Sequence, residues 1–354
     1  MATVGNYTIA DLMAIKFQSL KAFGLNTISE VVQRELDLHN SLVNDMVGGL
    51  CEVTSDGQRI YGTSLDGTMT KVDEFGRAPT VKMDFGDTVG FPFERMQYAI
   101  GWTADWFEKK TPADLAVVVR NAEMAHKREI ISAIKKALFF SANYAFRDYL
   151  VDYVTVNVKR LVNADSAKIP NGPYGVAFDG ASHTHYLGAA SLDATALRGV
   201  INTVMEHGFG HDLKVAFNYA DEAAIRAVTG FIPYLDARIV TPATTRDVPG
   251  EKLNISDVYD RPIGLFEGAE IMIKPWVPAF YAFASAYGEN SKPLCFRQSN
   301  TDGLQGLRIP ATYEAFPIHA EYMQAEFGVG VWTRTNGACL KFNNATYSDP
   351  TITT

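Results

Sequence analysis

The chain has 354 residues, of which 47% are hydrophobic and 20% charged, and its 28 glycines and 15 prolines are spread along its length. This fits a folded protein of about two or three domains with a sizeable core. The 40 acidic residues outnumber the 32 basic ones, giving a formal net charge of −8, which excludes a strongly cationic surface for gripping nucleic acid.

The N-terminal residues and the cysteines favour a protein of a reducing cytoplasm. Residues 1–7 lack the basic and apolar segments of a secretory signal, and no apolar run reaches the ~18 residues that span a bilayer, so we expect no membrane partner. Cys51, Cys295 and Cys339 are odd in number and far apart, which argues against a disulfide framework and against a cysteine zinc site.

Residues 1–50 contain two predicted helix starts. In each, a threonine precedes an acidic residue by three positions, Thr8 before Asp11 and Thr27 before Glu30, which is the capping-box pattern. No neighbouring segment obviously covers the two helices, so we expect them to dock on another surface.

Residues 51–107 change in character to short strand-like pieces. Turn signals recur at Asp56-Gly57, Asp66-Gly67, Phe75-Gly76 and Phe85-Gly86, and no piece has a strong core pattern. This predicts a long hairpin-like excursion that is poorly buried in its own chain. Ordering such a segment costs conformational entropy, and contacts with a partner surface would offset that cost.

The clearest predicted helix runs over residues 111–142. It begins with Thr111 as cap, Pro112 at the first helical position and Asp114 in the first turn, all favourable there. At 1.5 Å per residue, about 30 residues make a rod of ~45 Å. A rod of this length predicts an architectural element.

The second half of the chain alternates strands and helices. A strand is expected within residues 153–165, and residues 191–310 read as an α/β domain with a helix that ends at Gly208. Near the C-terminus, Gly328 and Gly330 precede Trp332. No helix start follows these glycines, so a phosphate-binding loop is disfavoured, and alternation predicts a tightly packed strand.

The motifs that could carry chemistry are few. Asp179, His183 and His185 are ligand types that zinc or iron accept, and a strand would place both histidines on one face. His207 and His211 lie four apart, but Gly208 and Gly210 interrupt a helix between them. No His-Glu-x-x-His motif or nucleophile motif is found. We therefore expect no catalytic residue and no cofactor, with these three residues as the candidate metal ligands.

The order of parts resembles the major capsid protein of tailed bacteriophages, the Hong Kong ninety-seven fold. The segments "VNVKRLVNADSAKIPNGPYGVAFDGASHTHYL" and "AEFGVGVWTRTNGACLKF" are similar to the segment after the long helix and to the closing strands of that family. The resemblance implies an α+β phage capsid fold with five parts. These are an N-terminal arm (1–50), an extended loop (51–107), a peripheral domain with the long helix (108–190), an inserted α/β axial domain (191–310) and returning peripheral strands (311–354).

The resemblance also implies a function without an active site. The chain would assemble with itself, as pentamers and hexamers, into an icosahedral shell around double-stranded DNA, with arm and loop reaching over adjacent subunits. Expected partners are a separate scaffolding protein, a portal, an optional decoration protein and weakly contacted packaged DNA. The location would be the virion capsid, assembled in the host cytoplasm. Two alternatives stay open: an encapsulin-like nanocompartment shell, and a metal-dependent enzyme using Asp179, His183 and His185.

Overall fold

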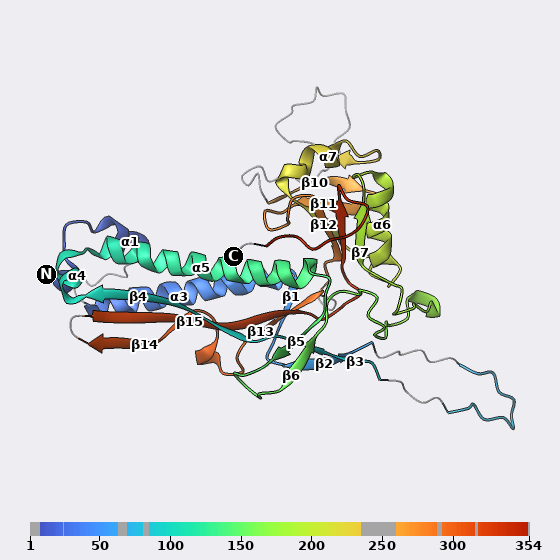
Figure 1. Cartoon of the computed structure of the whole chain (residues 1–354), viewed down its shortest axis with the longest axis horizontal. Coiled ribbons are helices and arrows are strands. Elements are labelled where there is room, and N and C mark those ends of the chain that lie inside the picture. Colours follow the sequence, from blue (N-terminus) through green and yellow to red (C-terminus); the bar gives the residue numbers. More distant parts are fainter. Residues whose placement is uncertain are drawn as a thin grey trace.

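The chain folds into an elongated part and a compact part that lie end to end (Figure 1). The computed structural model describes residues 8–23, 25–62, 69–80, 85–234, 260–288, 292–315 and 318–352. Long helices and a five-stranded sheet build the elongated part, whereas a seven-stranded sheet with short helices builds the compact part. One buried hydrophobic cluster fills the elongated part and extends to Tyr186, Phe283 and Cys339 of the seven-stranded sheet, and a second joins that sheet to its short helices.

The long helix of the elongated part is α5, Pro112–Phe139. Its start is the predicted one, because the Asp114 carboxylate accepts hydrogen bonds from the Thr111 backbone N–H and hydroxyl, both at 3.0 Å. Its 28 residues correspond to a rod of about 42 Å. Leu115, Val119 and Ile130 contribute to its buried side, so the predicted architectural helix is confirmed.

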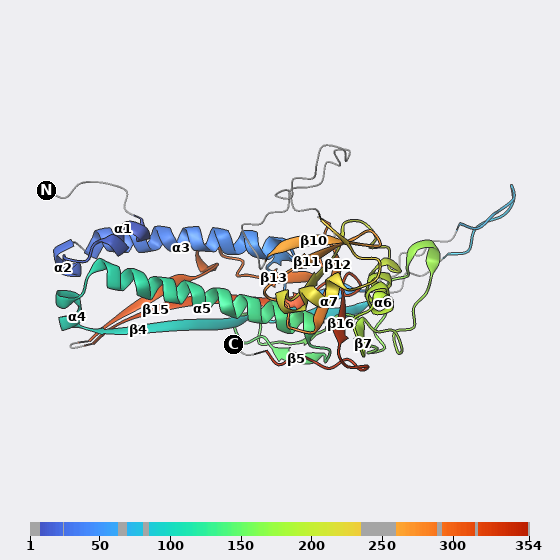
Figure 2. The same ribbon diagram turned by 90° about the horizontal axis from the view of Figure 1, so that it is seen from above.

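The N-terminal helices pack on their own chain, where α5 supplies the surface on which they were expected to dock. Helix α3, Leu25–Gly48, runs alongside α5 (Figure 2) and buries Val32, Leu36 and Val43 in the same cluster as the long helix. Helix α3 already begins at Leu25, so the helix start predicted at Thr27 is wrong. The Thr8 cap of α1, Ile9–Ala14, is formed as predicted, and α2 spans Leu20–Phe23.

The five-stranded sheet is organised around β15, Ile318–Val331, which pairs with β4, Glu94–Thr103, over ten residues. It also pairs with β14 and β13, and β13 pairs in parallel with β1. The expected loop of 51–107 is therefore shorter in the structure, since β1 and β4 belong to this sheet and residues 104–107 begin helix α4. The other strands span Cys51–Thr54 (β1), Leu294–Arg297 (β13) and Arg308–Ala315 (β14).

The remaining excursion leaves the elongated part through a two-stranded ribbon. Strand β2, Gln58–Tyr61, pairs with β3, Asp87–Gly90, and the described stretch beyond them, residues 69–80, projects far from both parts (Figure 1). Helix α4, Ala104–Lys109, follows β4 and leads into α5. A second ribbon pairs β5, Tyr144–Arg147, with β6, Thr155–Val158, and β6 is the core of the strand expected within 153–165.

The compact part contains a sheet of order β7-β16-β12-β8-β11-β10-β9. Its first strands, β7 (Tyr186–Ala189) and β16 (Ala338–Phe342), lie outside the expected axial boundaries of 191–310, whereas β13 and the start of β14 lie inside them but join the other sheet. The boundary prediction fails here because strand pairing between distant segments leaves no local signal. The other strands span Leu213–Phe217 (β8), Ile232–Pro233 (β9), Arg261–Phe266 (β10), Ala269–Ile273 (β11) and Tyr281–Ala286 (β12).

Two helices cover this sheet's core. Helix α6, Ala194–Met205, is capped by the Asp193 carboxylate, which accepts from the Ala196 backbone N–H at 2.8 Å. Helix α7 spans Glu222–Arg226, and short 3-10 turns occupy Pro173–Gly175, Tyr219–Asp221 and Asp302–Leu304. Among the described helices, none combines the length and apolar character that crossing a bilayer requires.

At the glycines of β15, the segment before β4 crosses the strand at close distance. A Cβ atom on Gly328 would lie 1.8 Å from the backbone oxygen of Pro92, and one on Gly330 would lie 2.8 Å from Cδ1 of Phe91. Only glycine lets the segment before β4 pass this closely over the strand. The predicted close-packed strand is confirmed.

Candidate assembly surfaces and a histidine cluster

The tip of the excursion exposes large apolar side chains. Met69 and Phe75 have relative exposures of 102% and 89%, and Phe85 at the return of the loop has 66%. Leaving such side chains in water is unfavourable by about 25 cal/mol per Å² of apolar surface. Apolar side chains that gather on a projecting segment are typical of a surface that contacts another molecule.

The base of the excursion is anchored firmly on the body of the chain. Arg59 pairs with Asp56 at 2.6 Å and Glu52 at 3.0 Å, and its guanidinium lies 5.2 Å from the ring centroid of Trp332. The hydrogen bond from Arg59 lowers the pKa of Asp56. Tyr61 adds a hydroxyl contact of 2.7 Å to the Thr335 hydroxyl. A fixed base and a projecting tip suit a segment that reaches outward.

A buried ion pair fixes the chain that returns from the excursion. Arg297 of β13 meets Asp148 at 2.7 Å, with side-chain exposures of only 3% and 2%. The same guanidinium donates to the Phe91 backbone oxygen at 2.9 Å and lies 4.9 Å from the ring centroid of Phe93. The pair therefore joins β13, the segment between β3 and β4, and the β5–β6 ribbon.

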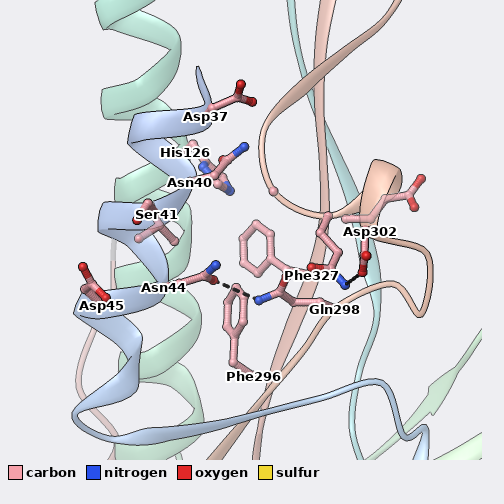
Figure 3. Close-up of a pocket in the computed structure, with 14 residues that line it drawn as sticks. Asp37, Asn40, Ser41, Asn44, Asp45, His126, Phe296, Gln298, Asp302 and Phe327 are labelled. Carbon is pink, nitrogen blue, oxygen red and sulfur yellow. Dashed lines mark hydrogen bonds between the residues drawn. The ribbon is translucent and has the colours of Figure 1, made fainter. Parts of the chain in front are cut away.

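A polar cleft of about 400 Å³ separates α3 from the connection between β13 and β14 (Figure 3). Asn44 of α3 accepts a hydrogen bond from Gln298 at 3.0 Å. The Asn40 side-chain amide makes two hydrogen bonds to the Leu307 backbone: Nδ2 donates to the carbonyl oxygen at 3.0 Å, and Oδ1 accepts from the N–H at 2.8 Å. These contacts hold α3 to its own chain, so the arm cannot swing away without breaking them.

Two histidines meet where α3 lies on α5. His39 Nε2 is 3.0 Å from His126 Nδ1, and both side chains are buried. The pKa of each imidazole is lowered to about 4, chiefly by burial, with the charge of Lys127 as a smaller cause for His39. The contact is therefore made between neutral rings at pH 7.

The structure brings His183 and His185 together, as the metal-ligand prediction required, but the third member is His207. The three side chains gather where β7 begins and α6 has just ended. Asp179 is exposed and instead accepts hydrogen bonds from the Ser182 hydroxyl and the Ala181 N–H. It stabilises a turn and is not part of the cluster, and His211 is exposed outside it.

The cluster is closely packed and partly shielded from water. His185 is fully buried, and the Phe178 ring lies 4.1 Å from the His207 ring between centroids. Burial lowers the pKa of all three imidazoles, to about 3 for His207. The only sequence signal for His207 is its place just after the predicted helix, because nothing local links residue 207 to residues 183 and 185.

No protein-family model matches the chain, and no curated protein matches it. Among solved structures, a chain described as Mycobacterium phage Patience is 17% identical, and the match covers 99% of this chain and 96% of that chain with a TM-score of 0.69. The capsid of an empty GTA particle matches at 12% identity over 84% and 89% of the two chains, with a TM-score of 0.49. The holo-SrpI encapsulin complex from Synechococcus elongatus matches at 12% identity over 88% and 91%, with a TM-score of 0.45.

The likeness to the Patience chain shows the fold. It extends along nearly the whole of both chains, so the elongated part, the compact part and their connections share one architecture with a phage protein. The α+β capsid fold expected from the resemblance is confirmed at this level.

Proposed function

We propose that this chain is a structural shell protein, the major capsid protein of a tailed phage, that assembles with copies of itself around double-stranded DNA. The observation that carries the proposal is the excursion beyond β2 and β3: its base is anchored by Arg59 and its tip exposes Met69 and Phe75. Such apolar surface becomes stable when a neighbouring copy covers it. The fold shared with the Patience chain supports the same proposal.

Such a shell protein needs no catalytic site. Each of the two parts corresponds to one domain of the shell subunit. In this proposal the elongated part is the peripheral domain, and the compact part is the axial domain, whose loops meet at the symmetry axes. The net charge of −8 suits a wall that contacts packaged DNA weakly. A scaffolding protein, a portal and a decoration protein are the partners such a shell would recruit, in the cytoplasm of the host.

The test compares the wild-type chain with a variant in which residues 69–80 are replaced by Gly-Ser-Gly. Both proteins are expressed with the genes that neighbour this one, purified and viewed by negative-stain electron microscopy. We expect closed shells from the wild type and soluble, folded subunits from the variant, because its anchored base is intact and only the exposed tip is lost.

The control is Val117→Ala on the exposed side of α5, which should assemble normally. Wild-type protein that stays a monomer or dimer under every condition would overturn the proposal. Nuclease-protected DNA in the shells supports a capsid, whereas an enclosed protein cargo without DNA would identify a nanocompartment.

A further inference from the structure

The ring nitrogens of the histidine cluster converge on one point. His183 Nε2 lies 3.2 Å from His185 Nε2 and 3.0 Å from His207 Nε2, and the His185 and His207 Nε2 atoms are also 3.0 Å apart. The three atoms thus form a nearly equilateral triangle. Each comes from a different backbone position, so the convergence is a property of the fold and not of one turn.

Hydrogen bonds alone do not satisfy this triangle. In a neutral imidazole, each Nε2 carries either a hydrogen or a lone pair. Three atoms with two states include at least two that are alike, so at least one contact brings two lone pairs or two N–H groups together. His185 has its state fixed, because its Nδ1 donates to the Gly337 backbone oxygen at 2.6 Å, which leaves a lone pair on Nε2.

A metal dication at the apex of the triangle resolves the conflict, because it accepts all three lone pairs. At zinc–nitrogen bonds of 2.0–2.1 Å, neighbouring nitrogens are about 2.9 Å apart on an octahedral face and about 3.4 Å apart in a tetrahedron. The observed separations of 3.0 to 3.2 Å lie between these values. Little movement of the rings is therefore needed.

The surroundings resemble the support that bound metals receive. A ligating histidine usually donates its second ring nitrogen to a carbonyl or carboxylate, as His185 does to Gly337. The Glu206 carboxylate lies 3.4 Å from His183 Nε2. The ligand atoms that all lie within 4.8 Å of one another are those of the three histidines, so Glu206 contributes a negative charge beside the site.

We infer that His183, His185 and His207 bind a first-row transition-metal dication, most readily zinc, beside the negative charge of Glu206. Nothing in the shell proposal requires this site. The ion would connect the segment that enters β7 with the end of α6. Through the bond of His185 to Gly337, it would also hold the link between β15 and β16, where the chain crosses from one sheet to the other. Its role is to stiffen the joint between the two parts.

The test uses the full chain without a histidine tag, stripped with a chelator, desalted and then titrated with zinc chloride. We expect one zinc per chain by elemental analysis after gel filtration, and a higher Tm with zinc than without it. His183→Gln and His207→Gln should each lower the zinc affinity at least tenfold and remove the rise in Tm. His211→Gln and Asp179→Asn are the matched controls and should bind as the wild type does.

Cobalt gives a second readout. Bound at this site, Co²⁺ should show visible absorption that appears with one equivalent and is absent in His207→Gln, whose fold is checked by circular dichroism. Folded wild-type protein that retains no zinc, or His207→Gln protein that retains a full equivalent, would overturn the inference. The zinc readout requires no assembled particles, so its failure is distinguishable from failure of the shell proposal.

Discussion

At the scale of single residues, Gly328 tests the close crossing of β15 by the segment before β4. A methyl group there would lie 1.8 Å from a backbone oxygen, which cannot rotate away as a side chain would. We expect Gly328→Ala to lower the free energy of unfolding by about 3 kcal/mol or more, at the upper end of overpacking effects, in urea titrations of the unassembled chain.

Gly101 is the matched control for this substitution. It lies in β4 of the same sheet, and a Cβ atom there meets nothing within 4 Å. Gly101→Ala should leave the free energy of unfolding within about 0.5 kcal/mol of the wild type, or raise it slightly. Equal losses in the two variants would show that the crossing is looser than described.

The Arg297–Asp148 pair makes a second residue-scale prediction. Asp148→Asn leaves the Arg297 guanidinium buried without its counter-charge, so we expect a loss of about 3–5 kcal/mol in the free energy of unfolding. The exposed pair of Arg198 and Glu267 is the control, where Glu267→Gln should change stability by at most about 1 kcal/mol. A loss as small as the control's would mean that water reaches the pair.

The roles of single residues could be predicted where they depend on neighbours in the sequence. The capping groups Thr8 and Thr111, and the strand that contains Gly328, could be read from neighbouring residues. The metal-ligand prediction named His183 and His185 correctly as neighbours but took Asp179 for the third ligand. Asp179 accepts hydrogen bonds within its own turn. His207 is brought to the cluster by the packing of α6, and no residue spacing in the sequence predicts that contact.

At the scale of elements, the two histidines between α3 and α5 make stability depend on pH. Their pKa values of about 4 lie below the ~6.5 of an exposed histidine, so the unfolded chain binds these protons more readily than the folded chain. Their contribution to stability is full above pH ~6.5 and is lost as the pH falls toward 4. Acid should therefore loosen α3 from α5.

The measurement is the free energy of unfolding from pH 7 to pH 4 for the wild type and His126→Gln, which cannot titrate. The variant lacks one of the two titrating histidines, so its free energy of unfolding should fall less steeply as the pH decreases. The difference in slope should be up to about 1.4 kcal/mol per pH unit. His211→Gln, at an exposed position, should follow the wild type. Parallel curves for wild type and His126→Gln would contradict a buried, neutral His39–His126 contact.

Elements were predictable where periodicity is strong. The start of helix α5 was predicted correctly and its end to within three residues, because cap, proline and apolar stripe all agree. Strands β1 and β4 were taken for parts of a loop, since each owes its position to a partner more than 200 residues away, β13 and β15 respectively. No segment that covers α3 could be identified from the sequence, because its partner α5 lies much later in the chain.

At the scale of the whole molecule, the described residues combine two packed parts with a projecting segment that these parts do not bury. Two buried hydrophobic clusters pack the body of the chain, and the base of the excursion is anchored on it. The tip, by contrast, leaves the apolar side chains of Met69 and Phe75 in contact with water. In a closed shell, every copy both offers a tip and receives one, so a single weak contact is repeated around the particle.

The measurement that tests this account most directly is a cryo-electron microscopy reconstruction of particles formed by the wild-type chain. The account predicts a closed icosahedral shell in which residues 69–80 of each copy lie on the adjacent copy, with Met69 and Phe75 covered by it and α3 still packed on its own α5. A shell in which the excursion folds back onto its own subunit, or stays exposed to solvent, would contradict it.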